Sequence, residues 1–286
     1  MIYLNGEFVP LAEAKVSVMD RGFLFGDGVY EVIPVYSRRP FRLDQHLARL
    51  ANTLAGVRLH NAYSAAQWTA LIMRIVDQAE SADQQVYLQV TRGVDSRRSH
   101  AFPRQATPTV MIMSEALLPP SRAECEEGVA AVTAVDNRWL RCDLKVTSLL
   151  ANCLLRQLAV DAGCAETVLL RDGFLSEGAA ANIFLVKDHV LLAPQRNHLM
   201  LPGVTYDVVL ELASAHGLKA EVRDILESEL RAADEVWLSS STREVLAIVR
   251  LDGKAVGRGQ PGPVFRRMYD WYQAYKTQVM HGRHDD

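Results

Sequence analysis

The chain has 286 residues and a formal net charge of −3, with 49% hydrophobic and 23% charged residues. These values are typical of a globular protein with a buried core, and they exclude a strong electrostatic attraction to nucleic acid or anionic membranes. The first residues carry no signal-peptide pattern, and no run of about 18 apolar residues is available to span a membrane. The four cysteines follow neither a CxxC nor a disulfide pattern, so we expect reduced thiols in a cytoplasmic protein.

The first 116 residues are predicted to form a domain of mixed strands and helices (α+β). Asn5-Gly6 suits a tight turn between two short strands. Asp44 opens an amphipathic helix, and Ser64 with Gln67 forms a capping box at the start of a second one. The predicted strands cover residues 2–4, 7–9, 29–36, 86–91 and 109–113.

A linker is predicted at residues 117–122, because the paired prolines Pro119 and Pro120 can continue neither a helix nor a central strand. It separates an N-terminal domain (1–116) from a C-terminal α/β domain (123–286). The strands predicted in the second domain cover residues 129–135, 167–170, 182–186, 190–193, 235–239 and 245–251. The predicted helices cover residues 147–162 and 204–216, and a last one begins at Pro263.

Several common functional motifs are absent or incomplete. Residues 257–262 match the GxGxxG pattern, but a proline occupies the loop and too little chain follows to complete a dinucleotide-binding unit. The sequence contains no P-loop, no nucleophile-elbow serine and no HExxH pair. The eight histidines are scattered, so we expect no metal site.

One lysine is a candidate for Schiff-base chemistry, which requires an amine that is neutral at working pH. Burial and nearby cations lower the pKa of a lysine and so make this possible. Among the six lysines, Lys145 has apolar neighbours, lies just before the predicted helix at 147–162, and has Arg138 and Arg141 close in sequence. The alternative is a surface lysine at the end of a strand.

A second candidate is Glu177, which stands among small residues just before the predicted strand at Asn182. Small residues allow a backbone to approach a ligand closely, so this carboxylate could face a packed ligand. The alternative is an exposed glutamate in a loop.

A candidate phosphate site combines a helix start with a hydroxyl-rich turn. The N–H groups that begin the helix at Val204 and Thr205 suit an anion, and Ser240 and Ser241 add hydroxyls. Arg49 could close such a site. The alternative is an ordinary helix cap, an ordinary loop and a solvated arginine.

Arg98 and His100 lie in one predicted loop and could together bind a carboxylate. The alternative is a solvated basic loop.

In their order along the chain, these features resemble the fold-type IV pyridoxal phosphate enzymes, and most closely the bacterial D-amino-acid transaminases. The resemblance runs over about residues 1–275. It is carried by DRGFLFGDGVYE at 20–31, TRG at 91–93, RSHAFP at 98–103, RWLRCDLK at 138–145, Glu177-Gly178 with Asn182, and LPGVT at 201–205.

The resemblance implies a role for each candidate. Lys145 would be the Schiff-base and catalytic lysine, and Glu177 would pair with the pyridine nitrogen of pyridoxal 5'-phosphate. Tyr30 would lie near the cofactor hydroxyl and the substrate, and Arg138 would support this tyrosine and the cofactor. The implied phosphate ligands are Arg49, Val204, Thr205, Ser240 and Ser241, and the implied ligands of the substrate α-carboxylate are Arg98 and His100. One departure is Ala179–Ala181, where a serine-rich stretch is expected.

The resemblance also implies the fold and the reaction. The fold would be the two-domain α/β (α+β) fold of type IV aminotransferases, with the cofactor between the domains. The protein would be a homodimer, and the carboxylate-binding loop could come from the partner subunit. The reaction would be transamination of D-amino acids such as D-alanine with 2-oxoglutarate, giving a 2-oxo acid and D-glutamate.

Several alternatives remain open. Within the same fold they are a branched-chain L-amino-acid aminotransferase, an aminodeoxychorismate lyase and an R-selective amine transaminase. From a different class, the alternative is a protein that binds pyridoxal phosphate without turnover.

Overall fold

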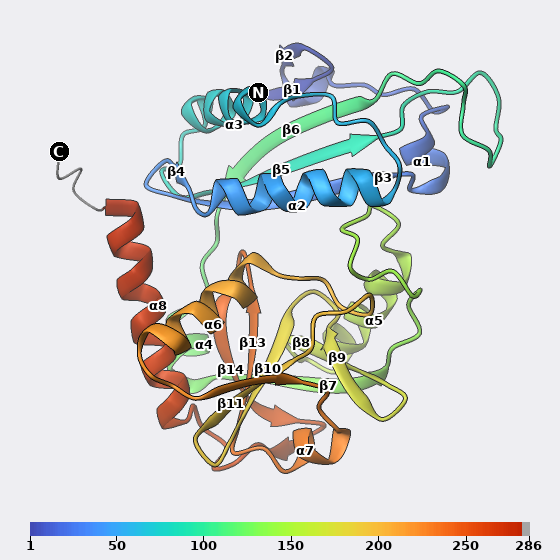
Figure 1. Cartoon of the computed structure of the whole chain (residues 1–286). Coiled ribbons are helices and arrows are strands. Elements are labelled where there is room, and N and C mark those ends of the chain that lie inside the picture. Colours follow the sequence, from blue (N-terminus) through green and yellow to red (C-terminus); the bar gives the residue numbers. More distant parts are fainter. Residues whose placement is uncertain (282–286) are drawn as a thin grey trace. The chain divides into compact units, whose positions relative to one another are not determined.

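The computed structural model describes residues 1–281, which form two compact units (Figure 1). The first contains Met1–Leu118 and Leu144–Leu149, and the second contains Pro119–Asp143 and the residues from Leu150 onward. Within the described residues, no helix is both long and apolar enough to cross a membrane.

The first unit is built on a six-stranded antiparallel sheet in the order β2-β1-β6-β5-β3-β4. Its strands are β1 (Ile2–Leu4), β2 (Glu7–Val9), β3 (Gly28–Tyr36), β4 (Arg39–Pro40), β5 (Gln84–Thr91) and β6 (Thr109–Ala116). A 3-10 turn covers Leu11–Glu13, and the helices are α1 (Arg21–Phe25), α2 (Leu43–Gly56) and α3 (Ala65–Gln78). The turn between β1 and β2 has positive φ at Asn5 (50°) and Gly6 (103°), which confirms the predicted hairpin.

The two faces of this sheet differ. On one face of β3, Val29, Ile33 and Val35 pack in a buried core with the apolar faces of α2 and α3. Glu31 has the same parity as these residues and is also completely buried. Tyr30 has the opposite parity, so it lies on the other face. The capping box at Ser64 is present, as predicted.

The segment Leu144–Leu149 belongs to the first unit, although the sequence placed Lys145 in a C-terminal domain. Its backbone bonds explain the difference. The amide of Tyr30 donates to the carbonyl of Lys145 at 3.1 Å, and the amide of Thr147 donates to the carbonyl of Gly28 at 3.0 Å. The segment is therefore extended beside β3, and the helix predicted from Thr147 begins only at Leu150.

The second unit is built on a nine-stranded mixed sheet in the order β12-β11-β10-β13-β14-β7-β8-β9, with β15 paired to β14. The β11–β12, β14–β7 and β7–β8 pairs are parallel. Its strands are β7 (Val129–Val135), β8 (Glu166–Arg171), β9 (Phe174–Gly178), β10 (Asn182–Lys187), β11 (Val190–Pro194), β12 (Ala220–Arg223), β13 (Glu235–Ser240), β14 (Glu244–Leu251) and β15 (Lys254–Ala255). Its helices are α4 (Arg122–Glu127), α5 (Leu150–Asp161), α6 (Val204–Ala215), α7 (Glu227–Arg231) and α8 (Pro263–His281).

The predicted strands of this unit are confirmed, and the structure adds β9, β12 and β15, which were not predicted. Strand β9 follows the Asp172-Gly173 turn and pairs with β8. Glu177 lies near its end and is buried. The interpretation of Glu177 as an exposed loop residue is therefore wrong.

Candidate active site

Lys145 and Tyr30 lie together in the first unit. The Nζ atom of Lys145 is 4.2 Å from the centre of the Tyr30 ring, within the range of a cation–π contact. The Tyr30 ring stacks on Tyr87 at 5.7 Å, and the Tyr87 hydroxyl donates to Oε1 of Gln89 at 2.7 Å. These residues form a polar, aromatic face of the sheet beside the lysine amine.

Arg138 and Arg141, which we expected to act on Lys145, are both bound to carboxylates of the second unit. Arg141 donates to both carboxylate oxygens of Asp143 at 3.0 Å. Within the first unit, Tyr30 and His46 lie near Lys145, whose positive charge adds to the effect of burial in lowering the pKa of His46. Burial is the largest cause of that lowering.

Arg49, a predicted phosphate ligand, is held by Glu31. Its Nε and Nη2 atoms each donate to a different oxygen of Glu31 at 2.8 Å, and Nδ1 of His46 lies 2.9 Å from the same carboxylate. Burial alone would raise the pKa of Glu31, but Arg49 and then His46 outweigh it and lower this pKa to about 2. The pair fixes the direction of the Arg49 guanidinium, whose contact with a phosphate stays a prediction.

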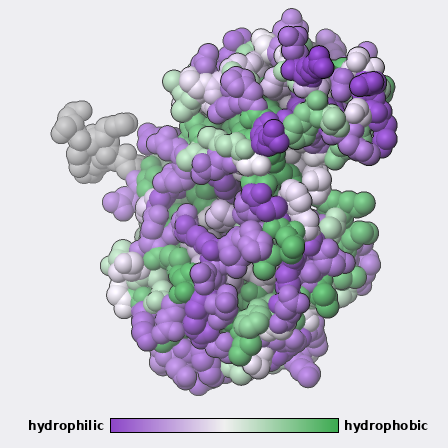
Figure 2. Space-filling model, turned by 45° about the vertical axis from the view of Figure 1, so that its right-hand side comes forward, coloured by the Kyte–Doolittle hydropathy of each residue, from purple (hydrophilic) through white to green (hydrophobic). Residues whose placement is uncertain are grey.

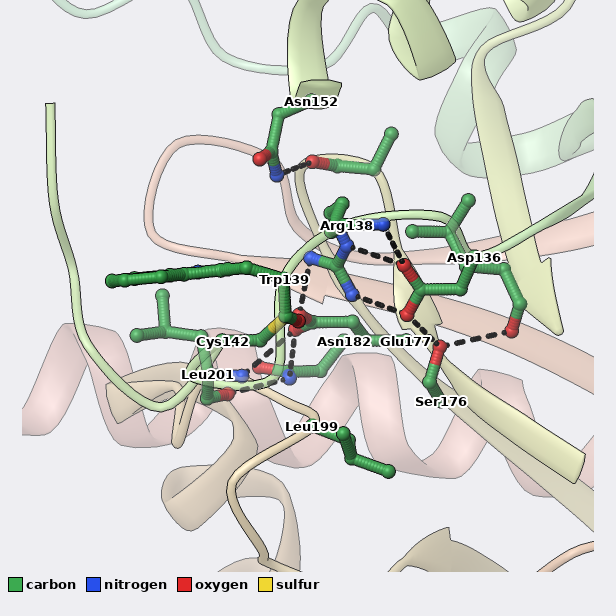
Figure 3. Close-up of polar contacts among 12 residues, drawn as sticks. Asp136, Arg138, Trp139, Cys142, Asn152, Ser176, Glu177, Asn182, Leu199 and Leu201 are labelled. Atoms are coloured by element: carbon green, nitrogen blue, oxygen red, sulfur yellow. Dashed lines mark hydrogen bonds and ion pairs between the residues drawn. The ribbon is translucent and has the colours of Figure 1, made fainter. Parts of the chain in front are cut away.

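Glu177 is the centre of a hydrogen-bonded cluster in the second unit (Figure 3). One oxygen, Oε1, accepts from Nη1 of Arg138 at 2.7 Å. The other, Oε2, accepts from the Leu201 amide at 3.1 Å and lies 3.4 Å from Nδ2 of Asn182. The remaining donors of Arg138 go to Asp136, with Nε and Nη2 each 2.9 Å from a carboxylate oxygen. Arg138 therefore supports Glu177, while its predicted support of Tyr30 stays a prediction.

The two carboxylates that share Arg138 differ in protonation. Burial, the largest effect, raises the pKa of Glu177 to about 7, although Arg138 and the Leu201 amide act in the opposite direction. The negative charge of Asp136 adds to the rise. Asp136 accepts hydrogen bonds from Nε and Nη2 of Arg138 and is also bound by Arg171. Its pKa therefore falls to about 2 despite its burial. Glu177 is thus a buried carboxylate with incomplete charge compensation.

The start of α6 lies next to Glu177. Nδ2 of Asn182 donates to the carbonyl of Leu201 at 2.9 Å, two residues before the helix-capping Gly203. A Cβ atom on Gly203 would lie only 2.1 Å from Oδ1 of Asn182, so this close approach requires glycine. Val204 and Thr205 are both buried in the first turn, where backbone N–H groups have no partner within the helix. They can therefore donate to an anion, as predicted for the phosphate.

The predicted serines lie where the strand paired with Asn182 ends. Ser240 ends β13, which pairs with β10, and Ser241 lies in the turn that follows. Oγ of Ser240 accepts from the Arg243 amide at 3.2 Å, which orders this turn. The Arg243 guanidinium pairs with Glu124 at 2.8 Å and is directed to that carboxylate.

Ala179–Ala181, where hydroxyls were expected, is ordered by other groups. The Ala179 amide lies 3.1 Å from Oε1 of the buried Glu166, and Nδ2 of Asn152 donates to the carbonyl of Ala179 at 3.0 Å. The turn beside Glu177 is thus held without serine side chains.

Arg98 and His100 are brought together on one aromatic ring of the first unit. The guanidinium carbon of Arg98 is 5.1 Å from the centre of the Phe25 ring, and the His100 ring is 5.3 Å from it. The structure therefore groups the two residues predicted to bind a carboxylate. Their binding of a substrate stays a prediction.

Sequence reasoning missed Glu31, His46 and Asp136. A signal for Glu31 was present, because it lies on the same face of the predicted strand at 29–36 as the apolar Val29 and Ile33. A charge on such a face requires a partner. His46 and Arg49 lie three residues apart on the predicted helix that follows this strand, and both can bind a carboxylate.

Comparison with solved structures defines the class of fold. The chain superposes on the branched-chain amino acid aminotransferase of Escherichia coli with a TM-score of 0.90 and 27% identity, covering 100% of this chain and 96% of that one. The branched-chain aminotransferase from the archaeon Thermoproteus uzoniensis, solved with norvaline, gives a TM-score of 0.87 and 25% identity, covering 99% and 95%. A further branched-chain amino acid aminotransferase, solved with pyridoxamine 5'-phosphate, gives a TM-score of 0.88 and 26% identity, covering 99% and 95%. The predicted two-domain fold of type IV aminotransferases is confirmed.

Residues 28–251 match the family model of amino-transferase class IV, and the chain belongs to this family. It is 38% identical to the D-alanine aminotransferase of Bacillus licheniformis over 267 residues, covering 93% of this chain and 94% of that protein. It is 35% identical to the D-alanine aminotransferase of Staphylococcus aureus (strain MW2), covering 96% and 97%. The protein is therefore an aminotransferase, and the predicted family is confirmed.

Proposed function

We propose that the protein uses pyridoxal 5'-phosphate to transfer the amino group of D-amino acids, such as D-alanine, to 2-oxoglutarate, giving a 2-oxo acid and D-glutamate. The observation that carries the cofactor assignment is the buried, incompletely compensated carboxylate of Glu177. The choice of D-amino acids rests on the relatives, which are D-alanine aminotransferases at 34–38% identity over nearly the full chain.

The residues present fit this cofactor. A protonated pyridine nitrogen would be a second cationic donor for Glu177, beside Arg138, and would complete its charge compensation. The start of α6 offers backbone donors for a phosphate, and Gly203 lets the chain approach closely there. Lys145 offers a primary amine for an aldehyde, beside the Tyr30 ring. The ring nitrogen, the phosphate and the aldehyde of pyridoxal phosphate thus each have a chemically matching group.

Lys145 has two tasks in this proposal. With the cofactor bound, the Lys145 amine would hold its aldehyde carbon, and the same Nζ would act as general base toward the proton on the substrate Cα. When bound, pyridoxal phosphate supplies an electron-withdrawing ring that stabilises the negative charge left at Cα. The Tyr30 ring and the bond between the Tyr30 amide and the Lys145 carbonyl hold this lysine in place.

With the cofactor bound, Glu177 would hold a proton on its pyridine nitrogen. Arg138 and the Leu201 amide fix the orientation of this carboxylate, with bonds of 2.7 Å and 3.1 Å. Val204, Thr205, Ser240, Ser241 and Arg49 are the proposed phosphate ligands. Arg98 and His100 are the proposed ligands of the substrate α-carboxylate, which requires cationic or N–H donors.

We also propose a homodimer in the cytoplasm. The second unit exposes large apolar side chains on α5, where Leu150 and Leu154 are 74% and 63% exposed. Figure 2 shows such hydrophobic residues, in green, among the hydrophilic surface. Exposed apolar residues on one helix favour burial against a second copy. All four cysteines are free, which suits a reducing compartment.

An absorbance spectrum of the purified protein tests the function directly. We expect a band of bound pyridoxal phosphate that changes to the amine form on adding D-alanine and returns on adding 2-oxoglutarate. L-Alanine should produce no change. Borohydride reduction followed by peptide mapping should place the cofactor on Lys145.

Two of the alternatives predict results that differ from these. Turnover with L-leucine and 2-oxoglutarate, but none with D-alanine, would identify a branched-chain L-aminotransferase, the class of the structural relatives from E. coli and T. uzoniensis. A protein that binds the cofactor but reacts with neither enantiomer would be a binding protein without turnover.

A further inference from the structure

The loop that carries Arg98 and His100 is bound by an arginine from outside the loop. Arg21, on α1, is only 3% exposed. Its Nη1 atom donates to the carbonyls of Ser99 and Ala101, and its Nη2 atom donates to the carbonyl of His100 at 3.3 Å. One rigid guanidinium therefore binds three consecutive carbonyls of the loop, a geometry that lysine cannot reproduce.

Asp27 joins this arginine to a second one. Its Oδ2 atom accepts from Nε of Arg21 and from Nε of Arg92, both at 2.8 Å, and Oδ1 accepts from Nη2 of Arg92 at 3.0 Å. The guanidinium carbon of Arg92 lies 3.7 Å from the centre of the Phe102 ring, the next residue of the same loop. Residues 99–102 are thus held by both arginines.

The short helix α1 is itself fixed to the sheet. Asp20 caps it by accepting from the Gly22 amide at 2.7 Å, and it also accepts from the hydroxyls of Thr91 at 2.7 Å and Thr109 at 2.6 Å. The Arg21 amide donates to the carbonyl of Gly93 at 2.9 Å. The side chains of α1 are therefore presented from a well-bonded position at the end of β5 and the start of β6.

The last residue of α1 contacts the proposed carboxylate ligands directly. Phe25 packs against the guanidinium of Arg98 at 5.1 Å and against the ring of His100 at 5.3 Å. Arg21 also lies over this ring, at 4.8 Å. One five-residue helix thus contacts both the backbone of the loop and the side chains of its two candidate ligands.

We propose that α1 is the positioning element for recognition of the substrate carboxylate, with Arg21 fixing the backbone of the loop and Phe25 directing Arg98 and His100. The inference rests on the proposed function in taking those two residues as the carboxylate ligands. Ordering a free loop costs conformational entropy, so a loop that is ordered before binding improves affinity for the substrate. Arg21 and Phe25 act through the loop and take no part in proton transfer.

The test is the split between KM and kcat in Arg21→Lys and Phe25→Leu. Arg21→Lys keeps the positive charge opposite Asp27 but loses the planar guanidinium that binds the three carbonyls. Phe25→Leu removes the aromatic ring while keeping an apolar side chain. We expect the KM for D-alanine to rise about tenfold or more in each, with kcat within about twofold and the cofactor spectrum unchanged. Arg104→Lys, at an exposed arginine of the same loop, is the matched control and should leave KM unchanged.

A second readout does not depend on activity. Amide hydrogen exchange of peptides covering residues 95–107 should be faster in Arg21→Lys than in the wild-type and Arg104→Lys holoenzymes. Unchanged exchange in this loop, or a fall in kcat without a rise in KM, overturns the positioning role. If the wild-type protein does not react with D-alanine but exchange still rises in Arg21→Lys, the proposed function fails while the anchoring of the loop by α1 stands.

Discussion

Glu31 in the first unit and Glu177 in the second are a matched pair with opposite behaviour. Both are buried, with 0% and 4% exposure, and both are bound to an arginine at 2.8 Å or less. The pKa of Glu31 nevertheless falls to about 2, whereas the pKa of Glu177 rises to about 7. Burial has the same sign in both, so the difference lies in the partners.

The partners differ in how many bonds the arginine gives. Arg49 donates to both oxygens of Glu31, and His46 adds a third contact. Arg138 gives Glu177 one bond, because its Nε and Nη2 atoms are taken by Asp136. The difference therefore follows from how the Arg138 guanidinium is divided, because Glu177 receives only one of its bonds. Glu31 is a completed structural pair, and Glu177 is left able to accept a further cationic donor.

The largest effect should come from neither carboxylate but from Lys145, the proposed reacting amine near the Glu31 pair. Lys145→Ala should lower kcat by at least about 10³-fold, because both cofactor attachment and proton transfer are lost. Initial rates with D-alanine and 2-oxoglutarate measure the loss. Lys145→Arg keeps the cation but cannot form the attachment, so it should be equally inactive. Wild-type rates in either variant contradict the mechanism.

The comparison is tested most directly by replacing each glutamate with glutamine. Glu177→Gln should lower kcat about 10²-fold or more, because an amide cannot hold a proton on the pyridine nitrogen. Glu31→Gln, the matched control, should lower kcat far less but destabilise the fold by about 3 kcal/mol, since it removes the negative charge that compensates the buried Arg49. Steady-state rates and urea unfolding give the two quantities. Equal losses of kcat in the two variants would remove the distinction between them.

The pH dependence of stability should separate the same residues in cofactor-free protein. The lowered pKa of Glu31 gives stability that is present above its ordinary value of 4.5 and is lost as pH falls toward about 2. The raised pKa of Glu177 acts oppositely, because the folded state retains the proton and loses stability as pH rises from 4.5 to about 7. Each contribution is about 3 kcal/mol.

Urea unfolding at a series of pH values measures these contributions. Glu177→Gln should remove the loss between pH 4.5 and about 7, and Glu31→Gln should remove the loss below pH 4.5. The same profile in both variants would show that the two carboxylates do not differ as described.

The smallest effect is expected away from both carboxylates. Arg98→Ala should raise the KM for D-alanine about 10- to 100-fold, the loss of one charge-assisted hydrogen bond, with little change in cofactor affinity. Titration with pyridoxal phosphate and steady-state kinetics measure the two constants. Equal weakening of cofactor and substrate would mean that Arg98 does not bind the carboxylate.

Local signals in the sequence predicted much of the fold. The hairpin at Asn5-Gly6 and the helix capped by Ser64 depend on neighbouring residues, and both are present. The strand that carries Glu177 was not predicted, because it is short and ends in small residues. The placement of Lys145 depends on backbone bonds to β3, which lies more than a hundred positions earlier. Such long-range bonds leave no periodic pattern in the sequence.

The site was predicted through resemblance more than through local chemistry. The order of motifs selected Lys145, Glu177 and Arg98, each of which lies in an ordered cluster, although their roles stay predictions. It did not predict that Arg138 is shared with Asp136, because the two residues that compete for it, Asp136 and Glu177, come together only in the folded sheet.

The return of Leu144–Leu149 to the first unit has a consequence for how the protein can be divided. The chain passes between the two units three times, so no single break yields two complete pieces. A fragment that stops at Leu118 lacks the extended segment that carries the amine, and its β3 edge loses the backbone partner at Lys145. Chimaeras that exchange one unit with a relative must therefore join the chain at three points, or they will separate the lysine from the sheet that positions it.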